Sequence, residues 1–356
     1  MQTDLENEVN YPDRFHVATV ERARHLLETN RKVAIVCHKG PDGDAVGSSL
    51  CLARVLRAMG KQVNVVVPDM MPENISFLPG YHSIVIGSAQ PERAFKTFAT
   101  ADLICMLDFN DIRRIDRLAP MVEESSARRL VIDHHLNPDI EADLVVSQPH
   151  RSSTCSLLYD LLMALGYEGL IDTDAAVCCC TGMMTDTHNF AFNANNPEDY
   201  LILARIVGKG VDKNKLYERL FEVESEGRIR ILGFAGYARM EVLREHGGAI
   251  TALSREDLDA FNYQRGDTEA LVNRPLNIPG IVYSIYLRED AKDFVKVSMR
   301  SRGAFSVKEI CQNYFGGGGH INAAGGEFHG SLTEAMDYLY GLLPEFDRML
   351  HEIDTN

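Results

Sequence analysis

The stretch CHKGPDGDAVGSS, which begins at residue 37, places one histidine and two aspartates within seven residues. Imidazole and carboxylate groups without thiolates favour hard or borderline metal ions such as Mn²⁺ or Mg²⁺ over structural zinc. A second interpretation is structural, because the PDGD tetrapeptide is also good turn chemistry. The stretch alone leaves both open. The three candidate ligands are His38, Asp42 and Asp44.

More acidic and imidazole groups follow other apolar runs of the chain. Crowded carboxylates are costly unless a counter-charge compensates them, and no run of Lys or Arg accompanies these groups. Divalent cations would supply that charge. Two such ions that share one carboxylate can activate water and hold the oxygens of a phosphate ester. The further candidates are Asp108, Asp133, His134, His135 and Asp186.

The elements that must position these groups alternate between short β-branched runs and helical patterns, which predicts βαβ units and a parallel sheet. The carboxyl ends of parallel strands meet at one edge, where ligands bind, so the acidic groups that follow the runs should converge there. An apolar helical pattern over 174–184 could bring Asp186 to the same edge. The runs are 33–36, 63–67, 103–107 and 130–132, with a helix expected between the first two.

Each candidate also has an ordinary structural interpretation. Asp44 could cap the following helix, Asp133 could fix a turn, and most single histidines are satisfied surface or core groups. Three acidic clusters at successive strand ends, two of which contain histidine, favour the metal site.

Composition limits the class of protein. A chain of 356 residues with 45% hydrophobic and 24% charged residues is typical of a globular protein with two domains. Its net charge of −15 argues against a protein that coats long nucleic acid. The acidic start, MQTDLENEVN, does not resemble a secretory signal, and no apolar stretch reaches about 18 residues, so a cytoplasmic protein without membrane spans is expected. The eight cysteines contain no CxxC pair and are expected in the core.

Pattern changes along the chain predict three regions. An α/β domain with a parallel sheet is expected over 1–196, and polar-spaced helices over 197–243 are expected to form a connector. A smaller α+β domain is expected over 244–356, with strands near 249–253, 281–287 and 294–299 and a helix over 307–314.

Five fragments in order, CHKGPDGDAVGSS, MLDFND, VIDHHLNP, GMMTDT and FGGGGHINAAGG, resemble the DHH phosphoesterase family with its DHH-associated C-terminal domain. The resemblance covers roughly residues 15–345. It implies a phosphohydrolase that depends on two divalent ions, usually manganese, with magnesium as the alternative.

The resemblance also assigns roles to residues. It implies that Asp108 bridges the two ions, that Asp133 orients the motif, and that His135 faces the substrate phosphate or the leaving oxygen. The implied ligands of one ion are His38, Asp42 and Asp108, and those of the other are Asp44, Asp108, His134 and Asp186.

In the second domain the resemblance implies substrate contacts. Guanidinium forks suit phosphate, and glycines let backbone N–H groups approach an anion. The alternative interpretations are a solvated strand face for the arginines and a flexible loop for the glycines. The residues are Arg300, Ser301, Arg302, Gly317, Gly318, Gly319 and His320.

One motif departs from the family pattern. Where members often read DTGxFR, this chain has His188 in place of glycine and Ala191 in place of arginine. The departure puts in doubt a substrate contact by arginine there and could change specificity more than catalysis.

The expected activity is that of the oligoribonuclease and pAp phosphatase branch of the family, which degrades short RNAs to mononucleotides or removes phosphate from pAp. Partners would be a short RNA or nucleotide, with no long nucleic acid and no membrane, and a homodimer is compatible with the sequence. The nearest rival is a soluble cyclic-dinucleotide phosphodiesterase acting on c-di-AMP or pApA. Polyphosphate hydrolysis and a catalytically silent nucleotide sensor are the remaining alternatives, and the complete set of ligand positions argues against the sensor.

Overall fold

The structure is a computed structural model that describes residues 14–264 and 266–354. Contacts within the chain divide it into two compact units, the first ending at Val223 and the second beginning at Glu224. The acidic start at 1–10, used above to argue against a secretory signal, lies outside the described residues.

The first unit is built on a six-stranded parallel sheet with the order β3-β2-β1-β4-β5-β6. The four predicted strands form its centre, which confirms the expected α/β fold. Two short edge strands were not predicted. The strands are β1 (Lys32–Cys37), β2 (Gln62–Val67), β3 (Val85–Ile86), β4 (Leu103–Leu107), β5 (Arg128–Asp133) and β6 (Leu144–Ser147).

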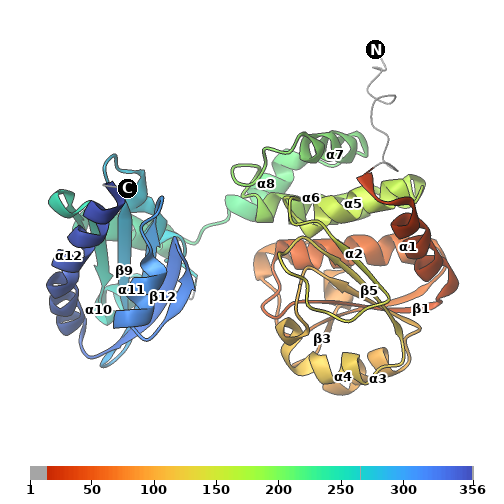
Figure 1. Ribbon diagram of the computed structural model, residues 1–356, viewed down its shortest axis with the longest axis horizontal. Helices are drawn as coiled ribbons and strands as arrows, with labels where there is room; N and C mark the ends of the chain where they lie inside the picture. The colour runs from red at the N-terminus through yellow and green to blue at the C-terminus, as the bar shows by residue number, and fades with distance from the viewer. Residues whose placement is uncertain (1–13, 265, 355–356) are drawn as a thin grey trace, which may run out of the picture. The chain divides into compact units, whose positions relative to one another are not determined.

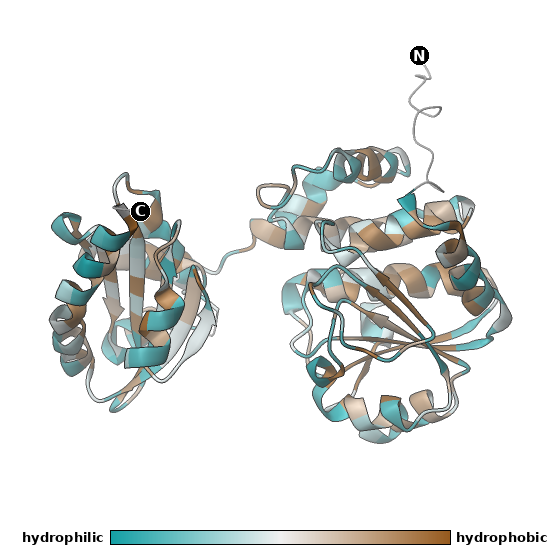
Figure 2. Ribbon diagram, viewed as in Figure 1, coloured by the Kyte–Doolittle hydropathy of each residue, from teal (hydrophilic) through white to brown (hydrophobic). Residues whose placement is uncertain are grey.

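Helices cover both faces of this sheet. In Figure 1, α3 and α4 lie on one face and α1, α2, α5 and α6 on the other. The central strands are brown in Figure 2 because both of their faces are buried. The helices are α1 (Val17–Thr29), α2 (Gly43–Ala58), α3 (Pro91–Ala99), α4 (Ala119–Glu123), α5 (Thr154–Ala164), α6 (Thr173–Asp186), α7 (Pro197–Gly208) and α8 (Lys213–Phe221).

Glycines let α2 and α6 approach closely. A Cβ atom at Gly47 would lie 2.4 Å from the carbonyl oxygen of Cys178, and one at Gly182 would lie 2.8 Å from Oδ1 of Asp44. Because no side chain separates the two backbones there, the helix that carries Asp44 and the helix that ends at Asp186 are held in close contact.

The second unit contains a mixed six-stranded sheet with the order β11-β12-β10-β9-β8-β7, in which only β8 and β9 pair in parallel. Three predicted strands and the helix over 307–314 are confirmed. The strands are β7 (Met240–Leu243), β8 (Gly248–Leu253), β9 (Tyr283–Ala291), β10 (Phe294–Ser301), β11 (Gly318–His320) and β12 (Ala323–His329). The helices are α9 (Glu226–Phe234), α10 (Arg255–Ala260), α11 (Val307–Tyr314) and α12 (Leu332–Asp354).

The expected connector over 197–243 is divided between the two units. Ile202 of α7 and Leu216 of α8 are buried in the core of the first unit. Ile231 of α9 is buried in a cluster of the second unit. Each helix therefore packs its apolar face on the nearer unit, and the division falls between α8 and α9 rather than at residues 196 and 243.

Two further expectations concern composition. All eight cysteines are free and buried, as expected for core residues. Within 14–264 and 266–354, every helix is too short or too polar to cross a membrane.

Candidate metal centre

The candidate ligands lie where the chain leaves the first sheet. Asp44 is in the first turn of α2, directly after β1, and Asp108 follows β4. Asp133 is the last residue of β5 and is followed by His134, while Asp186 is the last residue of α6. The structure thus brings candidate ligands from His38 to Asp186, which are 148 positions apart in the sequence, to one edge of the sheet, as the parallel sheet predicts.

Three groups of side chains at this edge offer ligand atoms within 4.8 Å of one another. In the first group Nε2 of His38 lies 3.7 Å from Asp42 and 3.4 Å from Asp108. In the second, Nε2 of His134 lies 3.4 Å from Asp186. The groups are His38, Asp42 and Asp108; Asp44, His134 and Asp186; and Asp108, His134 and His135.

Asp108 stands between the first two groups. Its Oδ2 faces His38 at 3.4 Å, and its Oδ1 faces His134 at 3.6 Å. The backbone of Asp108 is left-handed, with φ of 66°, and its N–H donates to the carbonyl of Ile132. A non-glycine residue held in this conformation is a strain that surrounding structure must support, and such residues gather at functional sites.

Each histidine of the DHH tripeptide has its own orienting partner. Nδ1 of His135 donates to Oδ1 of buried Asp133 at 2.7 Å, because that carboxylate can only accept when ionised. Nδ1 of His134 donates to the carbonyl of Arg151 at 3.1 Å. Asp133 therefore orients His135. The imidazole of His134 is oriented instead by the backbone carbonyl of Arg151.

The N-terminus of α5 holds two of the carboxylates, and the sequence analysis did not identify it. The carboxylate of Asp44 accepts the backbone N–H of Thr154 at 2.6 Å and that of Cys155 at 2.9 Å. The hydroxyl of Thr154 donates to Oδ1 of Asp108 at 2.9 Å. The signal that could have shown it is Ser153, a good N-cap before an apolar helix.

Electrostatics at the site disfavour a set of ionised carboxylates without a cation. Burial raises the pKa of Asp44 well above its usual range, and Asp108 and Asp186 raise it further. Burial also raises the pKa of Asp186 to about 6, against the opposing effect of His134. Burial opposes a charge on His38, but hydrogen bonds to Asp108 and Asp42 outweigh it and raise the pKa of His38 to about 10. A divalent cation at these positions would offset the repulsion between the carboxylates that contributes to the raised pKa values of Asp44 and Asp186.

The donor set fits divalent metal. It combines carboxylate oxygens with imidazole nitrogens, and each of the three groups has a member that is held by a hydrogen bond with Thr154 or Arg151. Thiolates are absent from the three groups, which favours Mn²⁺ or Mg²⁺ chemistry over a structural zinc site.

The chain matches two family descriptions: "DHH family, N-terminal domain" over residues 32–183 and "DHHA1 domain" over residues 249–348. It is 32% identical to the bifunctional oligoribonuclease and PAP phosphatase NrnA of Thermus thermophilus, over 88% of this chain and 90% of the relative. The chain belongs to the DHH family. The recognition made from the five fragments is confirmed.

Other relatives of this DHH-family chain carry different names. The cyclic-di-AMP phosphodiesterase GdpP of Geobacillus thermodenitrificans is 26% identical over 90% of this chain but only 50% of the relative. A crystal structure of an exopolyphosphatase-related protein from Bacteroides fragilis superposes with a TM-score of 0.87 at 38% identity, covering 94% of this chain and 98% of that one. The exonuclease RecJ bound to manganese shares the fold alone, at 16% identity and a TM-score of 0.50 over 95% of this chain and 94% of that one.

The departure from the DHH-family pattern has a structural correlate. His188 has a φ of 47°, in the left-handed region that glycine adopts freely, so this chain places a side chain where the motif has none. The ring of His188 packs against Phe221 with centroids 5.3 Å apart. The histidine is thereby supported by α8.

The predicted substrate-binding residues of the DHHA1 region lie in β10, β11 and the adjoining turns. Arg300 is half-buried and Arg302 exposed, while the hydroxyl of buried Ser301 already donates to the carbonyl of Phe305 at 2.6 Å. His320 is exposed at the end of β11. Their role in substrate binding stays a prediction. The Ser301 hydroxyl already uses its proton in a hydrogen bond within the chain.

The glycine run has a packing function in addition to the predicted one. A Cβ atom at Gly317 would lie 1.9 Å from the carbonyl oxygen of Gly325, and one at Gly319 would lie 2.4 Å from that of Ala323. Gly318 faces open space apart from Gln312. The run is therefore part of a strand pair rather than a flexible loop, since β11 forms from its second half.

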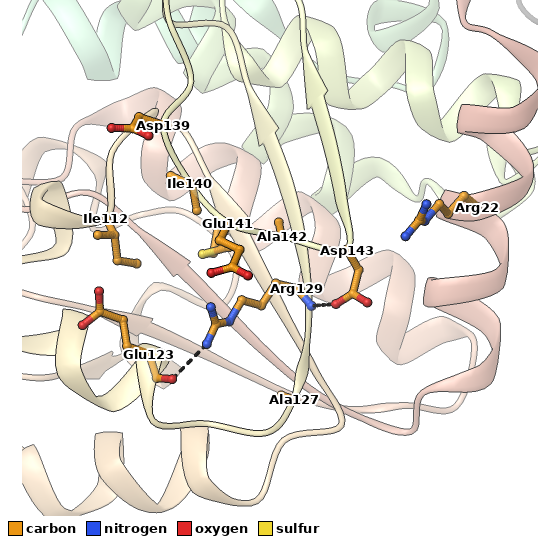
Figure 3. Close-up of a pocket in the computed structure, with 11 residues that line it drawn as sticks. Arg22, Ile112, Glu123, Ala127, Arg129, Asp139, Ile140, Glu141, Ala142 and Asp143 are labelled. Atoms are coloured by element: carbon orange, nitrogen blue, oxygen red, sulfur yellow. Dashed lines mark hydrogen bonds between the residues drawn. The ribbon is translucent and has the colours of Figure 1, made fainter.

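A cavity of about 730 Å³ in the first unit is lined by residues outside the three ligand groups (Figure 3). Its lining holds four carboxylates and two arginines, and Arg129 is already bonded to the carbonyl of Glu123. Asp143 is bonded to the backbone N–H of Arg129 and to Arg128. Because no residue of the three ligand groups lines it, the cavity adds nothing to the chemistry of the metal centre.

Proposed function

We propose that this phosphoesterase of the DHH family hydrolyses short nucleotides, degrading short oligoribonucleotides to mononucleotides, dephosphorylating pAp, or both. The observation that carries the proposal is the bridging position of Asp108, whose two oxygens face two separate ligand groups. The relatives named for both activities support the substrate class, because the chain covers 90% of one and 92% of another, the NrnA of Bacillus subtilis.

Two divalent ions, Mn²⁺ in preference to Mg²⁺, would be held by the ligand sets expected from the sequence, which are His38, Asp42 and Asp108 for one ion and Asp44, Asp108, His134 and Asp186 for the other. When bound, the ions would supply Lewis acidity and a water of lowered pKa.

The chain itself supplies orientation and proton transfer. Asp133 holds a proton of His135 on Nδ1 and directs Nε2 away from that carboxylate, so that Nε2 of the protonated imidazolium can donate to a phosphate oxygen. Protonation of His135 is favoured because the hydrogen bond to Asp133 raises the pKa of His135. The imidazolium can donate the Nε2 proton to a leaving oxygen and then keep its position through Nδ1.

In the second unit, Arg300, Arg302 and His320 are proposed to contact the substrate, together with the backbone of Gly317, Gly318 and Gly319. The proposal rests on the presence of guanidinium and imidazole groups beside a glycine-rich strand. The homodimer that the sequence allows and the cytoplasmic location stay predictions.

A second candidate is hydrolysis of c-di-AMP or pApA. It is favoured by the similarity to cyclic-di-AMP phosphodiesterases, although the chain spans about half the length of those relatives. Polyphosphate hydrolysis has the weaker support of one neighbour whose title calls it exopolyphosphatase-related.

Product analysis tests the proposal. The purified protein with Mn²⁺ is incubated separately with pApA, pAp, c-di-AMP and polyphosphate, and the products are separated by chromatography. Release of AMP from pApA or pAp is expected; faster cleavage of c-di-AMP would favour the second candidate, and no turnover of any substrate would contradict both.

The matched variant is Asp108→Ala, with the exposed Asp259→Ala as control. Because Asp108 would serve both ions, its loss should lower turnover by about a thousand-fold or more, since metal stabilisation of a transition state is worth several kcal/mol. Circular dichroism should show that the variant is folded. Near-normal turnover by Asp108→Ala would refute the metal assignment.

A further inference from the structure

A second cavity, of about 320 Å³, lies within the second unit. It is formed by β9, β10 and the segment 266–272, which passes over them. None of the residues expected to hold metal lines it, and of the residues expected to contact substrate only Arg300 does.

The alternation of β10 explains the character of this cavity. Val295, Val297 and Met299 face the core formed with α11 and α12. Lys296 and Ser298 therefore point to the opposite face, as does Arg300. On that face α9 and the 3-10 helix at 271–277 pack over β8 and part of β9, which leaves β10 accessible.

Positive charge predominates in the lining of the cavity, with three cationic side chains and one carboxylate, while Glu327 of β12 lies opposite Lys296 in the sheet. Lys296 and Arg300 take part in no ion pair with the residues of 14–264 and 266–354, and the guanidinium of Arg300 donates to the carbonyl of its neighbour Met299. Arg288, opposite Lys296 in the sheet, is by contrast paired with Asp290. Glu269 is the single carboxylate among the described lining residues. An anion is therefore the ligand that the charges favour.

A buried hydroxyl in this cavity also lacks a well-formed hydrogen bond. Tyr286 is only 5% exposed, and its hydroxyl makes no well-formed hydrogen bond within the part of the chain that the structure describes. Burial raises the pKa of Tyr286, although Thr268 lies beside the hydroxyl and opposes that effect. Ser298 is its cross-strand neighbour on the same face. A buried polar group without a partner is uncommon and calls for an explanation, and a ligand oxygen would satisfy it.

We propose that this cavity binds the phosphate group of a nucleotide. Lys296 and Arg300 provide the charge, and the hydroxyls of Tyr286 and Ser298 donate hydrogen bonds to the phosphate oxygens. The volume accommodates more than a bare ion. The phosphate is either that of a nucleotide of the substrate distant from the scissile bond or that of a free mononucleotide, and the identity of the ligand as a nucleotide rests on the proposed function.

The test is binding without turnover. The full-length protein in EDTA is titrated by calorimetry with penta-adenylate and separately with AMP, so that hydrolysis does not interfere. Lys296→Ala should weaken binding about tenfold, as expected for loss of a charged hydrogen bond. It should also reduce the dependence of log K on log salt by about 0.7 for the single-stranded probe. Tyr286→Phe should weaken binding several-fold.

Two matched controls separate this effect from general damage. Lys292→Ala removes another exposed lysine, from the turn between β9 and β10. Tyr283→Phe removes another buried, unpartnered hydroxyl from the opposite face of β9. Neither should change binding.

The outcomes distinguish the sources. Weaker binding of the pentamer alone supports a distant nucleotide of the substrate, and weaker binding of both probes supports a mononucleotide site. Unchanged binding in Lys296→Ala and Tyr286→Phe, or no measurable binding of either probe to the unmodified protein, would overturn the proposal. Because the assay needs no turnover, a failure of the proposed hydrolytic function would appear separately, in the product analysis with Mn²⁺.

Discussion

At the scale of residues, the proposed metal centre depends on groups that hold its candidate ligands as much as on those ligands. Asp44 accepts two backbone N–H groups from the N-terminus of α5, and Asp108 accepts the hydroxyl of Thr154. Both carboxylates are almost fully buried, so their orientation is fixed before any cation arrives. The bonds from α5 link the two carboxylates that belong to different ligand groups.

Thr154→Val tests this linkage. It removes the hydroxyl bond to Asp108 but keeps the backbone N–H that Asp44 accepts. We expect the Mn²⁺ concentration for half-maximal activity to rise about 10- to 100-fold, as for the loss of other partners of metal ligands. Thr154→Ser should restore it, and Thr181→Val, at a buried threonine with an unpartnered hydroxyl, should have no effect. Equal losses in Thr154→Val and Thr181→Val would contradict a positioning role.

At the scale of elements, the close contact of α2 with α6 positions the ligands that these helices carry. Gly43 as well as Gly47 lies against α6, since a Cβ atom at Gly43 would approach the hydroxyl oxygen of Thr185 to 2.3 Å. The contact sets the distance between Asp44 in the first turn of α2 and Asp186 at the end of α6.

Gly47→Ala should therefore destabilise the first unit. A methyl group 2.4 Å from a backbone carbonyl forces the helices apart, at a cost of about 1–3 kcal/mol or more. The free energy of unfolding of the first unit is measured by urea unfolding, with hydrogen-exchange mass spectrometry of peptides from β4 as the probe. The control is Gly233→Ala in α9, where a methyl group meets open space and should stabilise the helix by about 0.5–1 kcal/mol. Unchanged stability in Gly47→Ala would show that the helices can separate freely.

The N-terminus of α10 predicts a pH dependence of the second unit. Burial opposes ionisation of Asp257, but Arg239 and Ser254 outweigh it and hold the pKa of Asp257 below the usual 3.8. The ionised carboxylate therefore stabilises the fold above pH 3.8, and the contribution is lost as the pH falls through the lower folded pKa. Asp257→Asn should be less stable than the unmodified protein at pH 7 and differ less at pH 3, by urea unfolding. An equal difference at both pH values would contradict this.

At the scale of the whole molecule, the two units have separate cores, and all three ligand groups belong to the first. A cation that binds there stabilises the native first unit by mass action. The second unit contributes the proposed phosphate cavity and has no member in the ligand groups.

Removal of metal should consequently affect the two units differently. With Mn²⁺ at a hundred times its Kd, the first unit should gain about 2.7 kcal/mol of stability, which EDTA abolishes. Hydrogen exchange should speed up in α2 and β5 after EDTA, while β9 and β10 keep their protection. Equal changes in both units, or none, would be inconsistent with a metal centre confined to the first.

The sequence by itself determined the central strands of the first sheet and the class of chemistry. The β-branched runs gave the central strands, because burial on both faces requires apolar residues throughout, and each acidic cluster followed such a run. A parallel sheet then brings the ends of the strands together, so Asp108 and His134 could be assigned to one site before their distance was known.

The tertiary structure alone decided which groups hold the ligands and where the units divide. Arg151 acts through its carbonyl, and Thr154 acts through its backbone N–H and its hydroxyl. Such groups are abundant in any sequence, so only the packing shows which of them bond to His134, Asp44 and Asp108. The glycines at 317 and 319 similarly fit β12 because of strands that become neighbours only on folding. Such contacts depend on the positions of backbones, and periodicity in the sequence does not encode those positions directly.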